Sequence, residues 1–68
     1  MKIQVNGEPH EVEEGMTIIQ LLKQLDIDPE QSGIAVAKNQ DVVLEKEWEE
    51  TTIDSDSEIE IIHAVQGG

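Results

Sequence analysis

The sequence predicts an α+β domain in which one helix packs across a mixed β-sheet. With 68 residues, the chain has room for only one such domain. Residues 2–5 and 58–65 alternate side chains as strands with one buried face do. Between them, residues 18–25 carry one apolar stripe at helical spacing. A single helix stripe has to be buried against a neighbouring layer, here the face of a sheet.

The N-terminal segment is expected to form a hairpin. Residues 2–5 predict the first strand, and Asn6-Gly7 follows it. This dipeptide tolerates positive φ at both positions, which favours a tight two-residue turn. The second strand is expected over residues 8–13, with Val12 facing inward. Pro9 lacks a backbone donor, so this strand should lie at an edge or start late.

A helix is predicted after Thr17. Thr17 has the chemistry of an N-cap, and Gln20 stands three positions later as in a capping box. The apolar stripe consists of Ile18, Leu21, Leu22 and Leu25. Asp26, Asp28 and Pro29 should end the helix, since acids disfavour a helix C-terminus and Pro cannot continue a helix.

Two further strands and a short helical turn are predicted in the second half. Residues 34–38 are apolar enough for a central strand buried on both faces. Asn39-Gln40 predicts a turn into a short strand at 41–44. Residues 45–51 suit about one helical turn, and we expect Trp48, the one aromatic residue, to be a small satellite packing residue.

The last strand is expected over residues 58–65, with Ile59 and Ile61 on its inner face. The order of elements fits a β-grasp (ubiquitin-like) fold with four to five strands, in which the last strand lies beside the first. We therefore predict a single domain over residues 1–65 and a flexible Gly-Gly tail over 66–68.

Composition limits the partners. Acids outnumber bases 16 to 4, giving a net charge of −12, so nucleic acid and anionic membrane surfaces are unsuitable. A protein with a basic docking face is the natural complement. No apolar stretch is long enough to span a bilayer and the N-terminus has no signal-peptide pattern, so a cytoplasmic location is expected. The absence of Cys excludes disulfides and Cys-based zinc sites.

The Gly67-Gly68 end is the main functional signal. A carboxylate that is to be adenylated has to enter a narrow nucleotide site, and only Gly extends the backbone without a Cβ. A frayed terminus is the alternative interpretation. Before this end, Ile62 and Ala64 are expected on the outer face of the last strand, where apolar residues favour partner docking, together with Gln66.

Other candidate residues carry weaker signals. Asp54, Asp56 and Glu58 have the alternating spacing of a calcium loop, but its Gly and closing Glu are absent, which favours a solvated acidic turn. His10 and His63 are far apart in sequence, which favours two ordinary surface or strand histidines over a catalytic or metal-binding pair. No nucleophile-base pair or metal constellation is evident, so neither an independent enzyme nor a metal site is predicted.

Taken together, these segments resemble the ThiS family of sulfur carriers in thiamine biosynthesis. The resemblance covers essentially the whole chain. It is carried by Met1 to Gly7, Gly15-Met16-Thr17-Ile18 with Leu21-Leu22, Ile34 to Asn39, Val42-Val43, Trp48, Asp56 to Val65 and the terminal Gly67-Gly68.

The resemblance implies a carrier that binds no cofactor and catalyses nothing itself. It implies that a ThiF-like adenylyltransferase uses ATP and magnesium to adenylate Gly68. Sulfur from a cysteine desulfurase route then forms a thiocarboxylate, which donates sulfur to a ThiG-like thiazole synthase. Ile62 and Ala64 fall where the family docks its partners, and a monomer is expected for the free carrier.

Two departures from the family pattern bear on partner choice. Leu44-Glu45 stands where many members have Pro-Arg, and Gln66 stands where many have Gly. A small subunit of molybdopterin synthase of the MoaD type is the alternative within the same chemistry. A ubiquitin-like modifier and a plain binding module are the alternatives from other classes.

Overall fold

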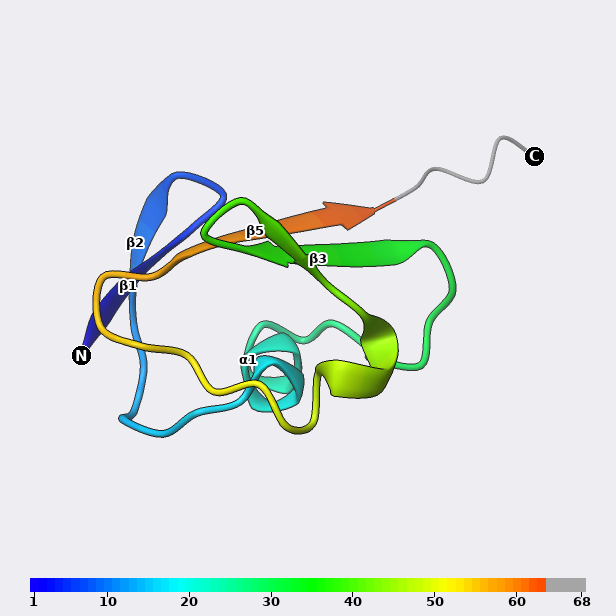
Figure 1. Ribbon diagram of the computed structural model, residues 1–68, viewed down its shortest axis with the longest axis horizontal. Coiled ribbons are helices and arrows are strands. Elements are labelled where there is room, and N and C mark those ends of the chain that lie inside the picture. Colours follow the sequence, from blue (N-terminus) through cyan, green and yellow to red (C-terminus); the bar gives the residue numbers. More distant parts are fainter. Residues whose placement is uncertain (64–68) are drawn as a thin grey trace.

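Helix α1 lies across one face of a mixed sheet in the computed structural model, which describes residues 1–63 (Figure 1). Over these residues the sheet has five strands in the order β2-β1-β5-β3-β4. The elements are β1 (Lys2–Val5), β2 (Glu8–Glu11), α1 (Ile18–Gln24), β3 (Ile34–Lys38), β4 (Asp41–Val43), the 3-10 helix η1 (Glu45–Glu47) and β5 (Glu58–His63).

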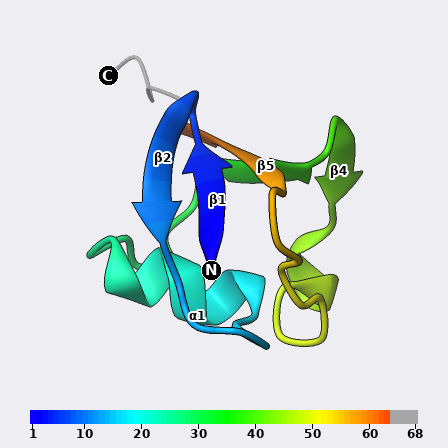
Figure 2. The same ribbon diagram turned by 90° about the vertical axis from the view of Figure 1, so that its left-hand side faces the viewer.

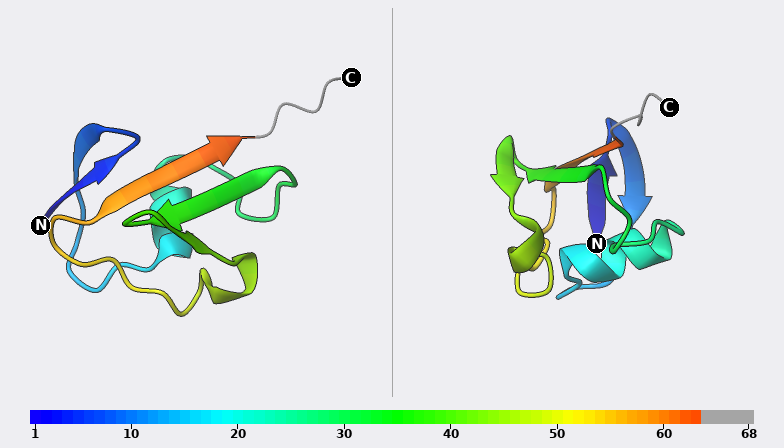
Figure 3. Two further views of the ribbon diagram at one scale, coloured as in Figure 1. Left: turned by 45° about the horizontal axis from the view of Figure 1, so that its top comes forward. Right: turned by 90° about the vertical axis from the view of Figure 1, so that its right-hand side faces the viewer.

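The first and last strands are neighbours, as predicted. β5 runs parallel to β1 through the pairs Gln4↔Glu58 and Val5↔Ile59. The other three strand pairs are antiparallel. Figure 2 shows β1 between β2 and β5, with α1 beneath the sheet, and Figure 3 shows β3 and β5 side by side. This mixed sheet with one crossing helix is the β-grasp fold.

The N-terminal hairpin forms as its residues predict. Asn6 and Gly7 have φ values of 52° and 83°, which makes the tight turn. β2 is an edge strand, so Pro9, opposite Gln4, removes no hydrogen bond from the interior of the sheet. The strand ends at Glu11 and is shorter than expected, but Val12 is still buried.

Helix α1 starts with the expected capping box. The Thr17 N–H donates to Gln20 Oε1 at 3.0 Å, and the Gln20 N–H donates to Thr17 Oγ1 at 3.3 Å. At the other end Asp26 has a φ of 61°, and the Ile27 N–H donates to the Leu22 carbonyl at 2.8 Å. This is a Schellman ending, so the helix stops at Gln24, five residues before Pro29.

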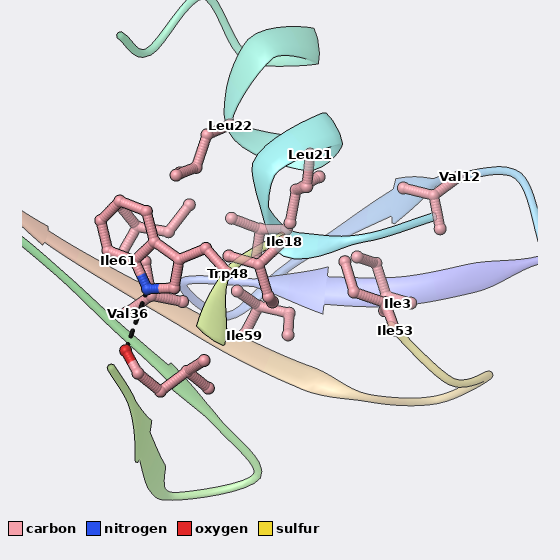
Figure 4. Packing of buried hydrophobic residues seen from close by; sticks show 12 residues of the cluster. Ile3, Val12, Ile18, Leu21, Leu22, Val36, Trp48, Ile53, Ile59 and Ile61 are labelled. Atoms are coloured by element: carbon pink, nitrogen blue, oxygen red, sulfur yellow. Dashed lines mark hydrogen bonds between the residues drawn. The ribbon is translucent and has the colours of Figure 1, made fainter. Parts of the chain in front are cut away.

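The core lies between α1 and the inner face of the sheet (Figure 4). Its fully buried members include Ile3, Ile18, Leu21, Leu22, Ile53 and Ile59. Trp48 belongs to this cluster and is 1% exposed, so the expectation of a satellite position was wrong. The cause is η1, which turns the chain beneath the sheet and brings Trp48 beside α1, where the Ile19 N–H donates to the Trp48 carbonyl at 3.2 Å.

Candidate functional site

The candidate site is built on the C-terminal half of β5. β3 pairs with β5 along its length, from Lys38↔Ile59 to Ile34↔His63. β1 pairs with β5 only as far as Ile59. Beyond Ile59, therefore, β5 has a strand on one side only.

The side chain of Asn6 takes the place of the missing strand. Its Oδ1 accepts a hydrogen bond from the Ile61 N–H at 2.8 Å, and its Nδ2 donates to the Ile61 carbonyl at 3.3 Å. The Asn6 N–H also donates to the Ile59 carbonyl at 2.9 Å. The main chain and side chain of one residue thus satisfy successive backbone groups of β5, which stay ordered beyond the end of β1. The sequence indicated Asn6 only as a turn residue.

An apolar patch covers part of the outer face of the sheet, opposite α1. Ile62 is 57% exposed, as the alternation of β5 predicted, and Val42 is 71% exposed. The register pairs Ala35 with Ile62 and Ala37 with Val42, which places all four on the same face. We refer to the set Ala35, Ala37, Val42 and Ile62 as the outer-face patch.

The outer-face patch corrects the prediction that residues 34–38 form a strand buried on both faces. Residues 34–38 were expected to be buried on both faces, but Ala35 is exposed because, within residues 1–63, no layer covers the outer face. The apolar run therefore indicated a surface and not a second core. The two Ala residues in the run were the available signal, because such small side chains contribute little to a core.

Acidic side chains continue the outer face along β5. Glu58 and Glu60 are exposed and alternate with the buried Ile59 and Ile61, so they share a face with Ile62. The strand thus presents two carboxylates followed by an apolar side chain. Such a row fits a partner surface with basic residues beside an apolar contact.

Four of the predicted site residues, Ala64, Gln66, Gly67 and Gly68, lie outside the described residues. Their roles therefore stay predictions. Ile62 is the described member of the predicted set.

The two histidines meet at one surface hollow, although they are far apart in sequence. His10 and His63 line it on the helix side of the sheet, with an apolar floor that includes Leu25 and Ile27. Within residues 1–63, no group of three or more His or acidic side chains is arranged to hold a metal ion. The acidic turn is used structurally, because Lys38 Nζ binds Asp54 at 3.0 Å and the Thr52 carbonyl at 2.7 Å.

In the described part of the chain, neither helix is long and apolar enough to cross a membrane.

Comparison with known proteins places this geometry in a family. The family model described as the ThiS family matches residues 3–68. The structure is similar to a crystal structure of the thiamine biosynthesis protein ThiS from Geobacter metallireducens, with a TM-score of 0.84, 26% identity and full coverage of both chains. A solution NMR structure of a thiamine biosynthesis protein from the same organism has a TM-score of 0.79 at 26% identity, with 100% of this chain and 88% of that chain covered.

A curated relative is the thiazole synthase of Magnetococcus marinus. It is 40% identical to this chain over 68 residues. The match includes all of this chain but only 20% of that protein, so the chain spans about a fifth of the relative's length.

Proposed function

Since the chain belongs to the ThiS family of sulfur carriers in thiamine biosynthesis, we propose that it carries sulfur as a thiocarboxylate on Gly68. A ThiF-like adenylyltransferase activates the Gly68 carboxylate with ATP and magnesium. Sulfur supplied through a cysteine desulfurase then replaces one carboxylate oxygen. The loaded carrier delivers this sulfur to a ThiG-like thiazole synthase.

The chemistry has two balanced steps. In the first, a carboxylate oxygen attacks the α-phosphorus of ATP and pyrophosphate leaves, which gives an acyl adenylate. In the second, sulfide attacks the acyl carbon and AMP leaves, taking the original oxygen with it; a thiol reductant releases this sulfide from the persulfide that the cysteine desulfurase forms. Activation is needed because a free carboxylate has no leaving group that sulfide could displace. The carrier supplies the acyl group, and its partners supply the catalytic residues.

The observation that carries the proposal is the family match through residue 68, which includes Gly67 and Gly68. Neither Gly adds a Cβ, so both fit a channel too narrow for other residues. From His63, the last described residue, five further residues span at most about 17 Å when extended, enough to reach into an enzyme cleft.

The outer-face patch gives such a partner a place to dock. Ile62 supplies exposed apolar area just before this segment, and Val42 adds to it from the edge strand β4. The net charge of −12, with Glu58 and Glu60 beside the patch, would steer a basic partner toward it. Recognition and reaction are then separate: the sheet face binds and the Gly-Gly end reacts.

The relative from Magnetococcus marinus supports the choice of a thiazole synthase as the sulfur acceptor. That protein bears the name thiazole synthase and contains a segment 40% identical to this chain. A carrier-like segment thus occurs in a protein named for the proposed acceptor activity. The two similar solved structures are also described as thiamine biosynthesis proteins, which favours thiamine over molybdopterin.

The test is the intact mass of the protein ending at Gly68 after incubation with a ThiF-like enzyme, ATP, magnesium and a sulfide donor. The expected product has one oxygen replaced by sulfur, and fragmentation should place the sulfur on Gly68. A variant lacking Gly67 and Gly68 is the matched control and should stay unmodified while keeping its circular dichroism spectrum. An unchanged mass of the full chain with an active enzyme would contradict the proposal.

A further inference from the structure

Two asparagine side chains hold β5, one at each end of the strand. Asn39 Oδ1 accepts a hydrogen bond from the Glu58 N–H at 2.9 Å, and Asn6 Oδ1 accepts one from the Ile61 N–H at 2.8 Å. Both asparagines sit in hairpin turns with positive φ, 50° at Asn39 and 52° at Asn6. The same type of hydrogen bond, from a backbone N–H of β5 to the side chain of a turn asparagine, thus occurs at the start of β5 and near its end.

The two positions differ in what else supports the strand. At Glu58, β5 is also paired with β1 through Gln4. At Ile61 the strand β1 has ended, and Asn6 supplies the described hydrogen-bond partners of the Ile61 backbone on that side. Removing the Asn6 side chain would therefore free one side of β5 over its last residues, 61–63.

These residues connect the two parts of the proposed mechanism. Ile62, in the outer-face patch, follows Ile61 directly, and the segment that leads to Gly68 starts after His63. A partner that has docked on Ile62 therefore receives the segment toward Gly68 from the end of β5, which Ile61 helps to position. Because the five residues after His63 span at most about 17 Å when extended, a shift at the end of β5 moves the starting point of that limited reach.

We propose that Asn6 is a positioning residue, which fixes Ile61 and thereby sets where the segment that leads to Gly68 leaves the docked sheet face. The inference rests on the proposed function, since it assigns a role in delivering the Gly68 carboxylate. The hydrogen bonds from Asn6 to β5 go to the backbone of Ile59 and Ile61, whereas the side chains of the outer-face patch point to the other side of the sheet. Its effect is therefore on the turnover of the bound carrier; docking is retained because Ile62 stays paired with Ala35 of β3.

The experiment compares Asn6→Gly with Asn39→Gly in steady-state thiocarboxylation by the ThiF-like enzyme, with the carrier as varied substrate. Gly suits both positions because it accepts positive φ without strain. For Asn6→Gly we expect kcat to fall about three- to tenfold with KM within about twofold, a modest misplacement effect. Asn39→Gly should leave both constants within about twofold, since Glu58 keeps its pairing with β1.

Two further measurements separate positioning from loss of stability. Urea unfolding of both variants shows whether their stability losses match. Amide exchange at Ile61 shows whether the hydrogen bond from its N–H to the Asn6 side chain has been lost. Asn6→Asp keeps an acceptor for the Ile61 N–H but loses the donor to its carbonyl, so its kcat should be intermediate. This conservative variant also serves if Asn6→Gly fails to fold.

The results separate the positioning role of Asn6 from the proposed carrier function. Equal kcat for Asn6→Gly and Asn39→Gly, or a change in KM alone, overturns the positioning role and leaves the carrier function in place. If the wild-type protein with an active enzyme is not thiocarboxylated, the proposed function fails and this inference fails with it. A selective fall in kcat with faster exchange at Ile61 supports it.

Discussion

The indole N–H of Trp48 donates a buried hydrogen bond of 2.9 Å to the carbonyl of Val43 (Figure 4). This bond ties the segment after η1 to the edge strand β4. Trp48 also has the largest side chain among those that are fully buried. One side chain thus combines core packing with an anchor for the edge of the sheet.

Replacing Trp48 by Phe should therefore be costly. The variant leaves the Val43 carbonyl without its buried partner and creates a small void, so we expect a loss of about 2–4 kcal/mol of unfolding free energy. Urea unfolding followed by far-UV circular dichroism measures it. Val42→Ala, one residue from Val43 and exposed, is the control and should change little. A loss below about 1 kcal/mol for Trp48→Phe would show that the hydrogen bond contributes little.

Neighbouring isoleucines on β5 should respond in opposite ways. Ile61→Ala removes a buried side chain and should lower stability by about 2–4 kcal/mol. Ile62→Ala changes an exposed residue and should stay within about 0.5 kcal/mol of wild type. Ile62→Ala should nonetheless weaken binding to the partner enzyme, as calorimetric titration would show. Equal stability losses in the two variants would contradict the placement of Ile61 on the buried face and Ile62 on the exposed face of β5.

Gln40 offers a stabilising substitution. It occupies the hairpin turn between β3 and β4 with a φ of 74°, where a residue with a Cβ is strained. Gln40→Gly should relieve this strain and, after the entropy cost of Gly, raise stability by about 0.5–1 kcal/mol. Chemical denaturation checks the sign, and Gln40→Ala, which keeps the Cβ, should show no gain. A gain of the same size for Ala would point away from φ strain.

Salt should stabilise the protein because like charges crowd its surface. Raising NaCl from about 0.01 M to about 0.15 M shortens the screening length from about 30 Å to about 8 Å. With a net charge of −12, the folded state should gain more from screening than the expanded chain, so Tm should rise by several degrees. The double variant Glu49→Gln, Glu50→Gln should show a smaller rise. A Tm that falls with salt would indicate that attractive ion pairs dominate.

Local patterns predicted most of the fold. The capping box at Thr17, the turn at Asn6-Gly7 and the edge position of Pro9 are each determined by neighbouring residues, and each is present. The outward direction of Ile62 followed from alternation alone. Because these features depend on a few adjacent residues, the sequence carries enough information for them.

Features that join distant segments were missed. The burial of Trp48 depends on where η1 turns beneath the sheet. The hydrogen bonds between the Asn6 side chain and the Ile61 backbone join residues 55 positions apart. The exposure of Ala35 arises because no second layer covers the outer face in the described part of the chain, which the apolar run 34–38 could not indicate. Each depends on tertiary placement, and for that reason no local pattern reports it.

The position of β5 also has a consequence for the order in which the domain assembles. β5 is synthesised after the other four strands, yet it lies between β1 and β3 and pairs with both. Until residues 58–63 have been made, a nascent chain holds two separate hairpins with no strand to join them, and isolated hairpins are marginal in water. The domain therefore acquires its cooperative structure only once residues 58–63 are available, because this one strand links the early and late halves.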